Sequence, residues 1–162
     1  MYARLFALLL ASAPLAAAAQ DEEEIYPVAP APPRLYLTAW GGALVDTGGQ
    51  FPAAGFGGAE VAWAFDALDV GVLAQGYRLG DRARTPWTPV ILGRILQRFE
   101  TRRGLEATLG IGIGAGRTDH WIGWFQFAVG LRIYEGPLFI AGEFGFEQLD
   151  LFRIAAGIGA RF

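Results

Sequence analysis

From Leu35 onward, apolar residues recur at every second position of the chain. A period of two is typical of β-strands whose faces differ, because successive side chains of a strand point to opposite sides. No long stretch of this region carries the apolar spacing of an amphipathic helix. Eight alternating segments can be marked. They span Leu35–Asp46, Phe56–Asp66, Leu68–Leu79, Trp87–Phe99, Gly104–Gly116, His120–Tyr134, Pro137–Glu147 and Leu151–Phe162.

The two faces of these segments differ in an unusual way. In the sixth segment, Phe125, Phe127 and Leu131 share one face, whereas Gln126 and Arg132 share the other. The interior of an eight-stranded barrel is only just wide enough for side chains to fill, so it has no room for the bulky face of every strand. The pattern therefore predicts an all-β, eight-stranded, antiparallel, up-and-down transmembrane β-barrel. Its bulky face meets lipid, and its glycine-rich, charged face packs inside.

The residues before the barrel have two different compositions. Arg4, the apolar run Leu5–Ala11 and the small residues up to Ala19 have the layout of a secretory signal peptide, which predicts cleavage between Ala19 and Gln20. Residues 20–34 are acidic and then proline-rich, so we expect a mobile periplasmic tether. Docking of this tether to the cell wall is an open alternative. The predicted organisation is a signal peptide over 1–19, a tether over 20–34 and a barrel over 35–162.

An even number of strands places both ends of the barrel on one side of the membrane, and the tether identifies that side as the periplasm. Short connections are expected on this side, and the outer loops of this chain are short too, which leaves little surface for binding a partner. The predicted periplasmic turns are Asp66–Ala67, Glu100–Arg103 and Glu135–Gly136. The predicted outer loops are Thr47–Gly55, Gly80–Pro86, Arg117–Asp119 and Gln148–Asp150.

Charged residues on the inward face are balanced in number. Pairing neighbouring strands across their turns brings Arg98 close to Glu106, Asp69 close to Arg94, and Glu143 close to Arg153. Because a buried unpaired charge costs several kcal/mol, a matched set is the tolerable arrangement. We interpret this set as a structural plug, with an ion path or ligand site as the alternative. Its members are Glu60, Asp69, Arg94, Arg98, Glu106, Arg132, Glu143, Glu147, Arg153 and Arg161.

Alternating glycines from Gly110 to Gly116 leave space along the inward face of the fifth segment. The predicted loop places Trp124 opposite Gly112, where its ring would cover the gap. The run lacks the G-x-G-x-x-G spacing of a nucleotide-binding loop.

Composition excludes much familiar chemistry. There is no Cys, and the single Ser, Ser12, lies in the predicted signal peptide, so the usual acyl-transfer nucleophiles are missing from the mature chain. One His makes a metal site a poor fit. Asp119 and His120 are adjacent at a predicted outer loop, where an aspartyl-type barrel protease has its Asp and His residues, but a lone Asp-His step is common and we interpret it as a solvated loop pair. We expect no catalytic, cofactor or metal site. A net charge of -3 argues against nucleic-acid binding.

The signal peptide, the eight alternating segments and a last strand that ends in Phe162 resemble the small eight-stranded outer-membrane barrels of Gram-negative bacteria. The transmembrane domain of outer membrane protein A and its small relatives typify this family. The resemblance implies an integral outer-membrane location and contact with outer-membrane lipids. It also implies recognition of Phe162, Ile158 and Ile154 by the barrel-assembly machinery, and a monomeric protein.

Several functions are compatible with these features. The first is a non-catalytic structural or surface barrel with a blocked lumen. A narrow channel or carrier for a small solute is the main alternative. An enzyme acting on outer-membrane lipid and a soluble ligand-binding barrel are further possibilities, and each makes a different experimental prediction.

Overall fold

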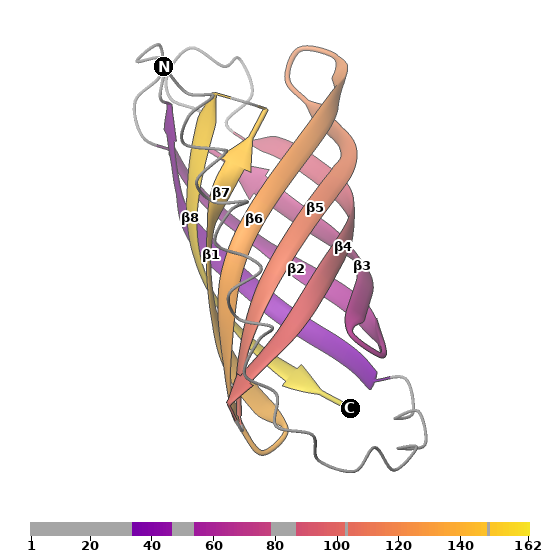
Figure 1. Ribbon diagram of the computed structural model, residues 1–162. Coiled ribbons are helices and arrows are strands. Elements are labelled where there is room, and N and C mark those ends of the chain that lie inside the picture. The colour runs from indigo at the N-terminus through magenta and orange to yellow at the C-terminus, as the bar shows by residue number, and fades with distance from the viewer. Residues whose placement is uncertain (1–33, 47–53, 79–86, 103, 149) are drawn as a thin grey trace, which may run out of the picture. The chain divides into compact units, whose positions relative to one another are not determined.

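A computed structural model describes residues 34–46, 54–78, 87–102, 104–148 and 150–162. Within these residues, eight antiparallel strands close into a barrel in the order β1 to β8, with β1 paired to β8 (Figure 1). The strands are β1 (Arg34–Asp46), β2 (Ala54–Phe65), β3 (Leu68–Tyr77), β4 (Thr88–Arg102), β5 (Leu105–Arg117), β6 (Trp121–Glu135), β7 (Leu138–Glu147) and β8 (Leu151–Arg161). The predicted fold class is confirmed. The predicted signal peptide, the cleavage site after Ala19 and the tether up to residue 33 lie outside the described residues.

The barrel has two unlike ends. The loop end holds the connections after β1, β3, β5 and β7, and the turn end holds those after β2, β4 and β6. Strand β8 ends at the turn end, where the C label stands in Figure 1. Leu35 and Phe162 exchange two backbone hydrogen bonds of 3.2 and 2.9 Å there, which close the seam between the first and last strands. Because every strand has two neighbours, the barrel has no open edge.

The turns differ slightly from the predicted ones. Strand β4 continues to Arg102 through an irregularity in register between Glu100 and Arg102, so the predicted turn Glu100–Arg103 is wrong by most of its length. The third turn lies at Gly136 and Pro137, one residue later than predicted. Asp66 and Gly136 have positive φ angles of 51° and 60°, as sharp turns between strands require.

The outward face is apolar and the inward face holds the polar groups, as the sequence predicts. Phe125 and Ile158 expose 38% and 62% of their surface, whereas Arg132 exposes 2%. Alternation along β7 is complete, with every inward residue from Phe139 to Glu147 buried and every outward one exposed. A water-soluble protein buries its large apolar side chains and exposes its charged ones. The opposite arrangement here indicates that the outward face is in contact with lipid.

The interior also contains more large aromatic side chains than the sequence analysis anticipated. Tyr36, Trp40 and Tyr77 are buried inside the barrel, and Tyr77 stacks on Trp124 with the ring centroids 5.8 Å apart. The glycines of the inward face make room for these rings. At Gly159, for example, a Cβ atom would overlap the ring of Phe139. In the described part of the chain, no helix is long and apolar enough to cross a membrane.

Candidate functional site: the ionic interior

Ion pairs and hydrogen bonds fill the barrel interior in three layers along its axis. We name them the loop-end layer, the middle layer and the turn-end layer. The loop-end layer surrounds Glu147, the middle layer surrounds Arg94, and the turn-end layer surrounds Asp69.

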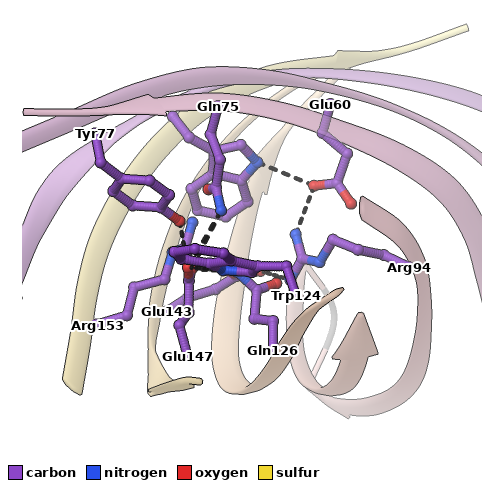
Figure 2. A network of polar contacts seen from close by, with 10 residues as sticks. Glu60, Gln75, Tyr77, Arg94, Trp124, Gln126, Glu143, Glu147 and Arg153 are labelled. Carbon is purple, nitrogen blue, oxygen red and sulfur yellow. Dashed lines mark hydrogen bonds and ion pairs between the residues drawn. The ribbon is translucent and has the colours of Figure 1, made fainter. Parts of the chain in front are cut away.

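The middle layer is a chain of alternating charges that crosses the lumen (Figure 2). Arg94 on β4 donates to Glu60 on β2 and to Glu143 on β7, at 2.9 Å each. Arg153 on β8 continues the chain, with Nη1 2.6 Å from Glu143. The indole nitrogen of Trp40 donates to Glu60 at 2.9 Å. Because the four charged side chains of this layer are buried, the low-dielectric surroundings make each contact strong and make the loss of any partner costly.

The loop-end layer holds one carboxylate in a cage of donors. Glu147 on β7 accepts hydrogen bonds from Trp124 Nε1 at 2.8 Å, from Gln126 Nε2 at 2.7 Å, and from the hydroxyl of Tyr77. Gln75 Nε2 adds a longer contact of 3.2 Å. Arg153 Nε lies 3.3 Å from the same carboxylate and joins this layer to the middle one. Donors from three strands, β3, β6 and β8, therefore compensate the buried charge of Glu147.

The turn-end layer pairs two arginines with two carboxylates. Asp69 on β3 pairs with Arg132 on β6 at 2.5 Å and with Arg98 on β4 at 2.9 Å. Glu106 on β5 lies 3.7 Å from Arg98 and accepts a 2.7 Å hydrogen bond from the Tyr134 hydroxyl. Arg98 and Glu106 are only partly buried, so this layer opens toward the turn end of the barrel.

Asp69 lies diagonal to Arg94 across the β3–β4 pairing, as predicted, but its ion pairs are with Arg98 and Arg132, and Arg94 pairs with Glu60 instead. One predicted member of the ionic network is wrong. Arg161 joins none of the ion pairs of the described residues, and its guanidinium lies 4.7 Å from the centre of the Tyr134 ring. The other two predicted pairs are observed, Arg98 with Glu106 and Glu143 with Arg153.

Trp124 covers a glycine, but not the predicted one. It pairs with Gly114, and its ring lies 2.5 Å from the position that a Cβ on Gly116 would occupy. The hairpin loop is one step later than predicted, since Arg117 pairs directly with Trp121. This shift moves the pairing by two residues, so Gly112 lies opposite Gln126.

Sequence reasoning missed Trp40, Gln75, Tyr77 and Gln126 as members of the network. One signal could have found Tyr77 and Gln75: both stand an even number of residues after the inward Asp69, and so share its face. Asp119 and His120 are exposed in the β5–β6 connection, apart from the interior layers. The described residues contain no group of three or more potential metal ligands.

The loop-end layer makes a testable prediction. Tyr77→Phe removes one donor to a buried carboxylate, and we expect the free energy of unfolding to fall by about 1.5–3 kcal/mol, the range for hydrogen bonds to charged groups. Tyr134→Phe removes the equivalent bond to the half-buried Glu106, where water can replace it, so a smaller loss is expected. Urea unfolding of both variants in lipid vesicles, followed by tryptophan fluorescence, checks this. Equal losses would contradict the cage around Glu147.

Comparison with known proteins adds information on the fold. The sequence matches no protein-family model and no curated protein. Among solved structures, Neisserial surface protein A is similar with a TM-score of 0.63 and 10% identity, over 83% of this chain and 100% of that one. The N-terminal β-barrel domain of Pseudomonas aeruginosa OprF has a TM-score of 0.64 and 13% identity, over 80% and 97%. A de novo designed transmembrane β-barrel has a TM-score of 0.57 and 16% identity, over 78% and 95%. The chain therefore has the fold of the eight-stranded outer-membrane β-barrels.

Proposed function

We propose that the protein is an integral outer-membrane barrel with a structural or surface role, without catalytic activity and with a lumen closed by its own side chains. The observation that supports this most directly is the unbroken line of contacts from Glu60 through Arg94, Glu143 and Arg153 to Glu147. This line joins strands on opposite sides of the barrel. An ion that entered the lumen would have to separate buried charges at a cost of several kcal/mol for each pair.

The outward face supports the membrane location. Its exposed side chains include Ile113 at 67%, Ile140 at 58% and Phe144 at 54%. Ordinary monomeric soluble proteins do not expose contiguous apolar surface over a whole barrel wall.

Assembly is part of the proposal. Ile154, Ile158 and Phe162 lie four residues apart on the outward side of β8 and of the residue that follows it, with exposures of 53%, 62% and 71%. They are therefore available to the barrel-assembly machinery, as the family resemblance implies. We expect a monomer.

Three measurements test the proposal. Fractionation should place the protein in the outer membrane, and unboiled samples should migrate more compactly on gels than boiled ones. In planar bilayers, we expect no steady conductance, with a known porin as a control for insertion. Sustained openings of uniform size would favour the narrow channel instead, and recovery in the aqueous fraction without detergent would overturn the membrane assignment.

A further inference from the structure

Two arginines and two tryptophans alternate around the outward-facing rim of the loop end, over the adjacent strands β3 to β6 (Figure 1). Arg78 follows β3, Trp87 precedes β4, Arg117 ends β5, and Trp121 begins β6. All four are exposed, Trp87 by 56% and Trp121 by 55%. Arg117 and Trp121 are directly paired. Trp87 also covers Gly76, with its ring 3.3 Å from where a Cβ would lie, so this indole lies against the outer wall.

The two guanidinium groups are free to bind an anion. In the described part of the chain, neither Arg78 nor Arg117 forms an ion pair, unlike the interior residues Arg94 and Arg153. At the turn end, the outward side of β6 ends in the acidic Glu135. The outward charges at these strand ends, Arg78 and Arg117, are therefore both positive and separate from the balanced interior, and the exposed Asp119 lies two residues after Arg117.

The outer wall next to the rim is apolar, and part of its surface is made of small residues. Ile91, Ile113 and Phe125 expose 51%, 67% and 38% of their surface there. Ala115 and Gly123 pair side by side, one row below Arg117 and Trp121. No atom lies within 4 Å of the position that a Cβ on Gly123 would occupy. The small residues thus leave room for the part of an amphipathic molecule that joins its head group to its acyl chains. The acyl chains themselves would contact the apolar side chains farther from the rim.

We propose that this rim binds a lipid of the outer leaflet that carries two phosphate groups. The inference rests on the proposed function and on the orientation predicted from the sequence, which puts the loop end at the outer surface. Tryptophans concentrate at the boundary between hydrocarbon and head groups, so they fix the depth of the rim. Arg binds phosphate oxygens through paired hydrogen bonds. Arg78 and Arg117 lie two strands apart and are offset along the strands, which separates their Cα atoms by roughly 12 Å. This spacing suits two phosphates on one head group better than a single one.

Native mass spectrometry of the delipidated full-length protein tests the proposal. The probes are diphosphoryl lipid A, monophosphoryl lipid A and phosphatidylethanolamine, each added in the same detergent. We expect diphosphoryl lipid A to bind best, and Arg78→Gln with Arg117→Gln to weaken its binding at least tenfold. Glu135→Gln is the matched control, since it removes an outward charge at the opposite end, and it should leave binding unchanged.

Each other outcome overturns the inference. Unchanged binding by the double variant, an equal loss in Glu135→Gln, or no preference for two phosphates would show that the rim does not recognise this head group. Displacement by millimolar inorganic phosphate would identify a simple anion site. Compact gel migration is measured on every variant, so a failure to fold is distinguished from a loss of binding. If lipid fails to bind while fractionation still places the protein in the outer membrane, the lipid site is rejected and the proposed function stands.

Discussion

Gly145→Ala is expected to prevent stable closure of the barrel. Gly145 lies on the inward face of β7, where a Cβ would overlap the carbonyl oxygen of Phe127 and crowd the Cα of Ala128 at 2.8 Å. These are backbone atoms of the neighbouring strand, so no rotamer change relieves the overlap and the β6–β7 pairing must open. We expect a loss of more than about 4 kcal/mol, the range reserved for severe single-residue defects. The measurement is the fraction of protein that migrates compactly without boiling after refolding into vesicles.

Gly142→Ala is the matched control for this variant. Gly142 lies three residues earlier on the outward face of the same strand, and nothing lies within 4 Å of its Cβ position. We expect a change within about 0.5 kcal/mol, or a small gain, because Ala suits a strand better than Gly. Equal behaviour of the two variants would show that the inward glycine is not required for close strand approach.

Arg94→Met should be the most damaging change in the ionic interior. It leaves Glu60 and Glu143 buried without their shared cation, and removing one partner of a buried pair typically costs about 3–5 kcal/mol. Urea unfolding in vesicles should show this as a lower midpoint. Arg161→Met is the control, since the Arg161 side chain forms no ion pair among the described residues and its guanidinium lies over the ring of Tyr134, and about 0.5–1 kcal/mol is expected.

A combined variant separates the loss of compensation from the loss of packing. Adding Glu60→Gln to Arg94→Met removes the carboxylate charge that lost its cation, keeps a side chain of similar volume, and leaves Glu143 paired with Arg153. The combined variant should be more stable than Arg94→Met alone. If it is less stable, the cost of Arg94→Met comes from packing, and the chain of charges is not what holds the middle layer together.

The sequence determines most of this fold because its signals are local. Alternation and turn residues are read along one strand at a time, and the orientation of the faces follows from the limited volume of an eight-stranded barrel. Pairs across one hairpin, such as Arg98 with Glu106, are predictable for the same reason. Their positions depend only on the turn between two successive strands.

Contacts across the lumen are a different problem. Arg94 meets Glu60 two strands away, and Tyr77 meets Glu147 on the opposite wall. These pairs depend on the shear of the closed barrel, which no single hairpin reveals. The prediction of the residue opposite Trp124 was wrong for a simpler reason. An error of one residue in the position of a loop shifts the pairing of the whole hairpin by two residues. Loop lengths therefore limit sequence-based prediction of the interior.

The seam between Leu35 and Phe162 has a kinetic consequence. It joins the two most distant parts of the domain, so bringing them together carries the largest loop-closure entropy of any strand pair, while the hairpins form from neighbouring residues. The seam is thus expected to form last. Until it does, the chain is a curved sheet with two unsatisfied edges that could recruit other strands, and the interval before it closes is when the protein is most vulnerable to aggregation.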